Sequence, residues 1–216
     1  STNITLNGEN FRSVTITINQ MAAPSAMVDR TLIFHFFGTS LGRYFTTNIE
    51  DAKTAIGNGA LGTNNRVVCI KQSSATNGTI FELCYNPDDK SVIERHIKDF
   101  ALSSTHVSTD EVGAIIAEAA EAAPANSYAM VFAGHGTGWI PRVLAESSVS
   151  TLALGYDAWI PAEGAEVTRH FGESNVKLDI SEIAESIAYS GIELDYILFD
   201  ACFMSNIEAV YDLRNS

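Results

Sequence analysis

Four short stretches of the chain are almost continuously hydrophobic and rich in β-branched and aromatic residues. They are TLIFHFF (31–37), RVVCIKQ (66–72), SYAMVFAG (127–134) and LDYILFD (194–200). Runs of this length and composition are typical of strands that are covered on both faces of a sheet. Each run therefore predicts a strand inside a covered sheet.

Helical segments separate these strands, and four of them open with a polar residue followed three positions later by glutamate. The pairs are Thr47 with Glu50, Ser108 with Glu111, Asp179 with Glu182 and Ser205 with Glu208. In such a capping box the two side chains accept hydrogen bonds from N–H groups that have no partner in the first helical turn. Strands that alternate with amphipathic helices predict an α/β domain with a mostly parallel sheet and helices on both faces.

The N-terminal residues have a different composition. They are polar and rich in turn residues, apart from the alternation in SVTITI (13–18), which suits an edge strand. We therefore predict an N-terminal arm over residues 1–28 and a single globular domain over residues 29–216.

Two internal segments complete the predicted organisation. TIFELCYNPDD (79–89) predicts a strand and turn, paired as a hairpin with 66–72 through an Asn77-Gly78 turn. From Gly136 to about Lys177 the chain holds two prolines, two tryptophans and no sustained period. Such a stretch is expected to form a long loop of the kind usually kept for function.

Charge and cysteine content exclude several classes of protein. Thirteen basic residues against 26 acidic ones give a net charge of −13, which repels phosphate backbones, so no nucleic-acid partner is expected. No apolar run approaches the roughly 20 residues of a membrane-spanning helix. Three cysteines are too few for a disulfide framework, although a bridge between Cys69 and Cys84 stays open and would leave Cys202 unpaired.

Two strand ends carry reactive side chains. VFAGHGTGW places His135 just after one predicted strand, and LFDACFMS places Cys202 just after another. Sites in parallel α/β sheets form outside the carboxyl ends of strands, and a thiol beside an imidazole is what a cysteine nucleophile requires. The expected positive start of a helix capped by Ser205 favours the thiolate, whereas the nearby Asp200 opposes it.

The glycines around His135 suit the same chemistry. Gly134 and Gly136 allow the backbone to approach a substrate closely, and the Gly136 and Cys202 N–H groups could bind a developing oxyanion. The alternative is a buried cysteine that packs as a small hydrophobic residue and a histidine that only closes a turn. His35, inside a strand, is expected in the core or behind the site.

Metal and nucleotide chemistry have weaker support. No third or fourth ligand stands at zinc-site spacing from His135 and Cys202. GTSLG (38–42) loosely suggests a phosphate loop but lacks GxGxxG and a following lysine, so a nucleotide-binding domain is the least favoured interpretation.

These motifs and their order resemble the clostripain family of cysteine peptidases, in the caspase-like clan that also holds gingipains and legumains. The resemblance covers roughly residues 29–214. It rests on AMVFAGHGTGW, on TRHFGES followed by KLDISEIAESI, and on DYILFDACFMSNIEAVYDLR. It implies a caspase-like fold and a bacterial enzyme, secreted, periplasmic or on the cell surface. The implied activity is cleavage of peptide bonds after a basic residue, usually arginine, through a thioester. No cofactor is required; calcium enters by resemblance to some relatives only, because no calcium-loop spacing is present.

The resemblance also assigns roles to residues. Cys202 would be the nucleophile, His135 its proton-handling partner, and the Gly136 and Cys202 amides the oxyanion hole. Asp200 would line an acidic specificity pocket, where it could bind a guanidinium through charge-assisted hydrogen bonds. The alternative for Asp200 is a cap or loop anchor at the strand end. No third member of a catalytic triad is required, and the sequence shows none.

Two expectations concern the rest of the protein. Relatives usually continue well beyond the cysteine helix, so a C-terminal companion segment is expected to complete the sheet and the substrate groove. Cleavage between His135 and Cys202 is familiar as an activation step, with Arg142, Arg169 and Lys177 as basic targets. The alternative function is a catalytically inactive caspase-like scaffold that binds partners.

Overall fold

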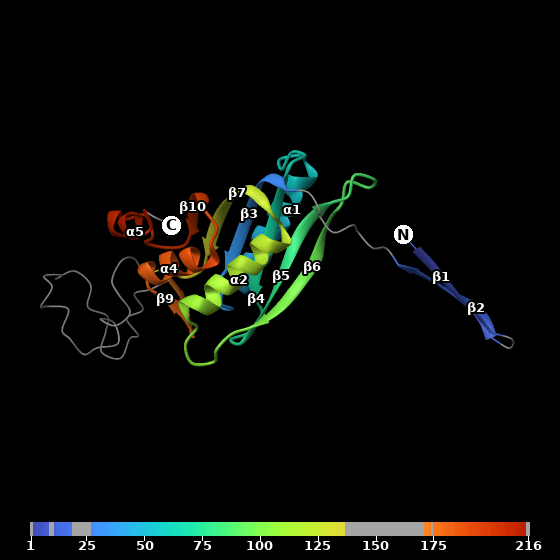
Figure 1. Cartoon of the computed structure of the whole chain (residues 1–216), viewed down its shortest axis with the longest axis horizontal. Coiled ribbons are helices and arrows are strands. Elements are labelled where there is room, and N and C mark those ends of the chain that lie inside the picture. Colours follow the sequence, from blue (N-terminus) through green and yellow to red (C-terminus); the bar gives the residue numbers. More distant parts are fainter. Residues whose placement is uncertain (1, 9–10, 19–26, 137–170, 174, 215–216) are drawn as a thin grey trace, which may run out of the picture.

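A computed structural model describes residues 2–8, 11–18, 27–136, 171–173 and 175–214 of the chain (Figure 1). The strands are β1 (Thr2–Gly8), β2 (Phe11–Ile18), β3 (Val28–Phe36), β4 (Asn65–Gln72), β5 (Asn77–Tyr85), β6 (Val92–Ala101), β7 (Ala125–Ala133), β8 (Phe171–Glu173), β9 (Val176–Leu178) and β10 (Leu194–Asp200). The helices are α1 (Gly42–Gly57), α2 (Thr109–Ala122), α4 (Ile180–Ser190) and α5 (Ile207–Asp212).

Six strands form one mixed sheet in the order β10-β7-β3-β4-β5-β6. The first four run parallel, and β5 and β6 continue the sheet in antiparallel pairing. The four hydrophobic runs of the sequence are the four parallel strands. The predicted α/β sheet is therefore confirmed, with an antiparallel edge added to its parallel part.

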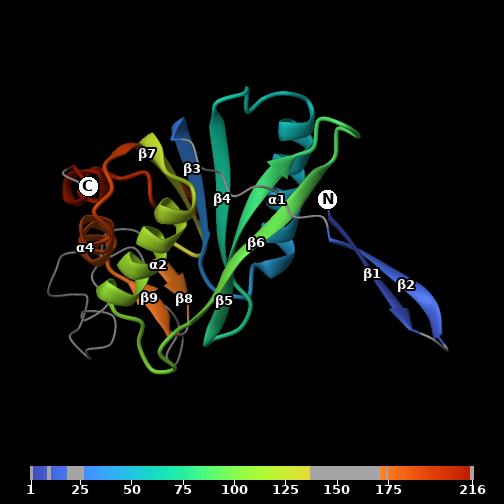
Figure 2. The ribbon, with the colours of Figure 1, turned by 45° about the vertical axis from the view of Figure 1, so that its right-hand side comes forward.

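Helices cover both faces of this sheet, as predicted (Figure 2). On one face, buried residues of α2 and α4 such as Ile116 and Ile183 share a core with Ile33, Met130 and Phe132 of the sheet. On the other face, α1 contributes Phe45, Ile49 and Ile56 to a second core with Phe36, Val67 and Cys69. Because side chains alternate along β3, this one strand supplies both cores.

The hairpin of β4 and β5 is confirmed, but its turn lies elsewhere. Gln72 pairs with Gly78, so the turn is formed by residues 73–76, and Asn77 and Gly78 begin β5. A Cβ atom at Gly78 would lie 2.1 Å from the Phe100 ring, so glycine leaves room for that ring. Phe100 belongs to β6, a strand that the hydrophobic pattern did not reveal because most of its side chains are exposed or only half-buried.

The N-terminal strand is also confirmed. SVTITI lies within β2, which pairs antiparallel with β1 in a two-stranded sheet of its own. The division into an arm over 1–28 and a domain over 29–216 stays a prediction.

Two of the four expected capping boxes are present. The Ser108 hydroxyl accepts from the Glu111 N–H at 3.2 Å, and the Glu111 carboxylate accepts from the Ser108 N–H at 2.9 Å. At the start of α4, the Glu182 carboxylate accepts from the Asp179 N–H at 2.8 Å. Both helices therefore begin where the sequence indicates.

The other two expected caps are wrong. Thr47 lies inside α1, which begins at Gly42, and its hydroxyl donates to the carbonyl of Arg43. At α5 the cap is Asn206 rather than Ser205, and its side chain accepts from the Ala209 N–H at 2.8 Å.

This contrast gives a test on stability. Ser108→Ala is expected to lower the free energy of unfolding by about 1 kcal/mol, because it removes a helix cap. Thr47→Ala, at an exposed position inside α1, is expected to change it by less than about 0.6 kcal/mol, in the stabilising direction, because alanine has the higher helix propensity. Urea denaturation of both variants checks the contrast, and equal destabilisation would contradict the observed start of α1.

Candidate active site

The ends of β7 and β10 lie side by side. These parallel neighbours pair Ala133 with Asp200, and the Gly134 N–H donates to the Asp200 carbonyl oxygen at 3.3 Å. His135 and Cys202, each two residues beyond the end of its strand, therefore leave the sheet at the same edge.

Gly136 brings the histidine loop against the cysteine turn. A Cβ atom at this position would lie 2.4 Å from the Cys202 carbonyl oxygen and 2.9 Å from Met204 Cγ. No side chain fits at so short a distance without moving the backbone of the turn. Glycine is therefore required here by close approach, and the approach joins the two candidate catalytic segments.

Cys202 stands in an exposed turn between β10 and α5. The following residue, Phe203, has a left-handed backbone with φ of 58°, and Met204 is buried and anchors the turn. Helix α5 begins only at Ile207, so the helix start lies farther along the chain from Cys202 than the sequence suggested. What the turn provides is an accessible sulfur beside the histidine loop.

The other two cysteines differ from Cys202. All three are free, so the Cys69–Cys84 bridge is not formed. Cys69 is buried, and burial raises the pKa of its thiol. Burial, followed by the charge of Glu82, also raises the pKa of Cys84. Both thiols are therefore kept protonated in the neutral range.

Two polar side chains contact the His135 ring, and the sequence analysis assigned a role to neither. Nε2 of His135 lies 3.0 Å from Ser40 Oγ and 3.9 Å from Glu173 Oε2. Ser40 belongs to the loop after β3, and Glu173 ends β8. The Gly172 N–H donates to the His135 carbonyl at 2.8 Å, so β8 is attached directly to the histidine loop.

Glu173 is held by the loop that resembled a phosphate loop. Its carboxylate accepts hydrogen bonds from the N–H groups of Thr39 and Ser40 and from the Ser40 hydroxyl. Burial alone raises the pKa of Glu173, but the hydrogen bonds from Ser40 and Thr39 outweigh burial and lower this pKa below its usual value. The Thr39 and Ser40 amides of GTSLG thus bind an anion supplied by the protein itself.

An aromatic cluster lies where the ends of β3, β7, β8 and β10 meet. The Phe171 ring lies 4.8 Å from Phe37 and 5.7 Å from Phe199, and the Phe132 and Phe199 rings are stacked 5.7 Å apart. His35 stacks on Phe37 at 4.0 Å inside the same core. Burial lowers the pKa of His35 to about 3, so it is neutral, in agreement with its expected place in the core.

Asp200 is exposed at the end of β10. Its Oδ2 accepts a hydrogen bond from Asn48 Nδ2 of α1 at 2.8 Å. The carboxylate is thereby oriented by a helix on one face of the sheet, at the edge where His135 and Cys202 also leave it. No motif in the sequence linked Asn48 to this edge.

The expected long loop is partly replaced by regular structure. Its last residues form the hairpin of β8 and β9, in which Lys177 pairs with Gly172. Arg142 and Arg169 lie outside the described residues. Within the described part of the chain, no group of three or more His, Cys, Asp or Glu side chains could hold a metal ion.

Comparisons with known proteins show the family to which the chain belongs. The model of the clostripain family matches residues 38–216. No curated protein matches the chain. A secreted C11 cysteine protease from Bacteroides thetaiotaomicron, called iotapain, is 27% identical with a TM-score of 0.69, and the match covers 88% of this chain and 50% of that one. An inactive zymogen C11 protease from Parabacteroides distasonis is 25% identical with a TM-score of 0.62, over 88% of this chain and 46% of that one.

The chain thus spans about half the length of the solved relatives that it matches. The matched region contains both candidate catalytic segments and the hairpin of β8 and β9 between them. The resemblance first noted in the motifs is confirmed by this match, and the chain belongs to the clostripain family.

Proposed function

We propose that the protein containing this chain is a cysteine endopeptidase in which Cys202 is the nucleophile and His135 handles its proton. The observation that carries the proposal is the close approach of Gly136 to the carbonyl of Cys202, which joins the two segments at one sheet edge. Membership of the clostripain family supports the same chemistry.

The residues suit acyl transfer. The sulfur attacks the substrate carbonyl carbon as its proton passes to His135, and the Gly136 and Cys202 N–H groups stabilise the oxyanion. Collapse of this intermediate breaks the C–N bond, and His135 returns the proton to the leaving amine. Water then hydrolyses the thioester, which releases the acid and restores the thiol.

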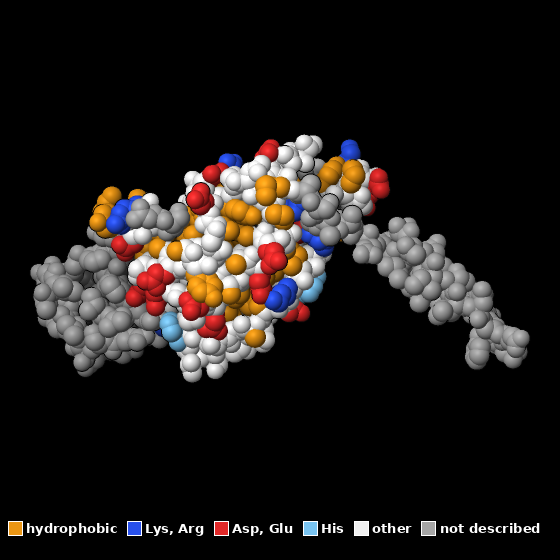
Figure 3. Space-filling model, viewed as in Figure 1, with side chains coloured by type: hydrophobic (Ala, Val, Ile, Leu, Met, Phe, Trp, Pro, Cys, Tyr) orange, Lys and Arg blue, Asp and Glu red, His pale blue; other side chains and the backbone are white. Residues whose placement is uncertain are grey.

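We propose further that Asp200 binds the basic side chain of the substrate. Its carboxylate is exposed and oriented by Asn48, and the chain is acidic overall, with a net charge of −13. Figure 3 shows acidic side chains spread over one face, with fewer basic ones. A guanidinium fits such a carboxylate best, because it forms charge-assisted and bidentate hydrogen bonds.

Specificity gives the test of this proposal. The complete protein is expected to hydrolyse fluorogenic peptides that end in arginine faster than matched peptides that end in glutamine. Asp200→Asn is expected to lower kcat/KM for the arginyl peptide roughly 10- to 100-fold, because a hydrogen bond to a charged group is lost, with little effect on the glutaminyl peptide.

The matched control is Asp99→Asn, an exposed carboxylate on β6 at the opposite edge of the sheet. It is expected to leave both rates unchanged. Equal loss on both peptides in Asp200→Asn would assign Asp200 to the structure of the turn and not to substrate recognition.

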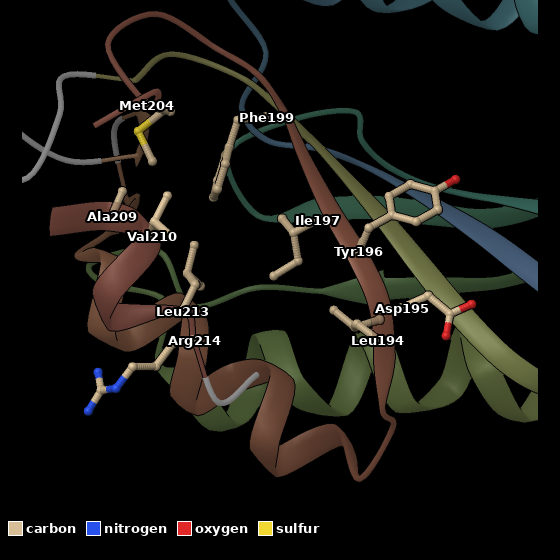
Figure 4. A pocket seen from close by; sticks show the side chains of 10 residues that line it. All are labelled: Leu194, Asp195, Tyr196, Ile197, Phe199, Met204, Ala209, Val210, Leu213 and Arg214. Atoms are coloured by element: carbon tan, nitrogen blue, oxygen red, sulfur yellow. The ribbon is translucent and has the colours of Figure 1, made fainter. Parts of the chain in front are cut away.

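We also propose that a companion segment of the same protein packs on β10. This strand is an edge of the sheet, and its Tyr196 and Leu198 are exposed. On its other side Ile197 and Phe199 line a pocket opposite α5 (Figure 4). Exposed hydrophobic side chains also gather on the cysteine turn and α5 (Figure 3), namely Phe203, Ile207, Val210 and Tyr211. These surfaces and the half-length match to solved relatives support the proposal that a companion segment packs on β10 and α5.

Intact-mass analysis of the protein from its native cells tests this part. A larger mass, or a second chain that co-purifies, is the expected result. A 23.3 kDa species alone would contradict it.

Location and activation complete the proposal. We place the protein outside the cytoplasm because the Bacteroides thetaiotaomicron relative is described as secreted. Separately, no described helix is long and apolar enough to cross a membrane.

We also propose activation by a cut between His135 and Cys202, since one relative is described as an inactive zymogen. Lys177 is a poor target for this cut, because it is paired within a β-hairpin.

A further inference from the structure

We infer that Ser40 and Glu173 are positioning residues that hold the His135 ring in the tautomer with its proton on Nε2. Nδ1 is then the nitrogen that takes the proton of Cys202 and later gives it to the leaving amine. The inference rests on the proposed function for its catalytic meaning. The ring state itself can be measured without any turnover.

The first step is a count of protons. An ionised carboxylate only accepts hydrogen bonds, so the Ser40 hydroxyl must donate its single proton to Glu173 Oε2. Ser40 Oγ can then only accept from the imidazole nitrogen that lies 3.0 Å away. The neutral ring therefore carries its proton on Nε2, and Nδ1 has the free lone pair.

The second step is that Glu173 is fixed in its ionised form. Its side chain is 18% exposed, and its Oε1 accepts from the Ser40 N–H at 2.7 Å and from the Thr39 N–H. Gly38, with φ of 83°, lets the loop wrap around this side chain, because a Cβ atom there would lie 2.3 Å from Glu173 Cγ. Three donors from one loop therefore preorganise the anion before any substrate binds.

The third step is the effect on proton transfer. When the thiol proton moves from Sγ to Nδ1, it leaves a thiolate and an imidazolium whose Nε2–H still donates to Ser40. Glu173 Oε2, 3.9 Å from Nε2, stabilises this positive charge. The ring is itself 51% exposed, so water would compete for Nε2 if Ser40 did not occupy it.

The direct test is the ring-nitrogen NMR spectrum of ¹⁵N-histidine-labelled chain, read for His135 at a pH where the ring is neutral. The expected result is a single tautomer with the proton on Nε2. Ser40→Ala and Glu173→Gln are expected to shift the ring towards a mixture of tautomers. Ser40→Thr, which keeps a hydroxyl, is expected to retain the Nε2–H form. A wild-type ring protonated on Nδ1, or a ring unchanged by Ser40→Ala, would overturn the inference.

Kinetics of the complete protein give the second readout. Ser40→Ala is expected to lower kcat about tenfold and to leave KM nearly unchanged, because the loss is only a fraction of what general-base catalysis supplies. Ser40→Thr is expected to restore kcat. The matched control is Ser103→Ala. The Ser103 N–H and hydroxyl bind the Glu111 carboxylate in the same way, at 2.9 and 2.8 Å, and this pair belongs to the start of α2.

The two claims fail separately. An Nε2–H ring that responds to Ser40→Ala in a protein without turnover would refute the peptidase and leave the positioning role standing. Full activity in both Ser40→Ala and Glu173→Gln would refute the positioning role and leave the peptidase standing.

Discussion

Replacing Cys202 by alanine is expected to abolish peptide hydrolysis without a measurable change in thermal unfolding. The thiol is exposed and belongs to neither hydrophobic core, so little packing is lost with it. Removal of a covalent nucleophile typically lowers kcat by about 10⁴-fold or more, because no other group can form the acyl-enzyme. Turnover of a fluorogenic arginyl peptide and a thermal melt of the same sample check both halves of this expectation.

Cys84→Ala is the matched control for this variant. Cys84 is also a free thiol, but it is half-buried on β5, so its loss is expected to leave the rate unchanged. Residual turnover in Cys202→Ala above about one part in a hundred would assign the nucleophile to another residue.

Gly136→Ala is expected to lower kcat/KM about 100-fold and the free energy of unfolding by about 1–3 kcal/mol. The new methyl group would stand 2.4 Å from the Cys202 carbonyl oxygen, which is backbone and cannot rotate away. The histidine loop and the cysteine turn must therefore separate, and a shift near 1 Å between reacting groups costs about two orders of magnitude in rate. Steady-state kinetics and urea denaturation measure the two losses.

Gly42→Ala tests whether the effect belongs to this contact or to glycine in general. Gly42 begins α1, and a Cβ atom there would have no neighbour within 4 Å. This variant is expected to keep full activity and to be equally or slightly more stable. If Gly136→Ala behaved like Gly42→Ala, the two segments would not be in contact in solution.

Much of the fold could be predicted from local pattern. Three of the four hydrophobic runs became central parallel strands, because a strand covered on both faces has no polar side to display. The fourth run, LDYILFD, forms the edge strand β10, and its predicted cover on both faces is not found among the described residues, since Tyr196 and Leu198 are exposed. The joint position of His135 and Cys202 also followed, since carboxyl ends of neighbouring parallel strands meet at one edge.

What local pattern could not predict depends on contacts between distant segments. Ser40 and Glu173 are 133 residues apart, and only the packing of the loop after β3 against β8 brings them to His135. The hint was present as backbone donors in GTSLG, a loop without a phosphate signature. The interpretation as a phosphate loop did not foresee that the anion bound by these donors is the carboxylate of Glu173.

The helix caps show the same limit at shorter range. Thr47 and Ser108 carry the same signal, an oxygen-bearing residue three positions before glutamate, yet only Ser108 caps a helix. Helix α1 begins earlier, at Gly42, directly after the loop that binds Glu173. The local motif at Thr47 therefore does not mark the start of this helix.

The most direct test of the central claim is to treat the complete protein with a peptidyl arginine chloromethyl ketone and to locate the adduct by peptide mass mapping. The expected result is one covalent adduct on Cys202, lost when His135 is replaced by alanine, with Cys84 unmodified. An adduct on Cys84 and none on Cys202, or labelling of Cys202 at the same rate without His135, would contradict a shared site for the thiol and the imidazole.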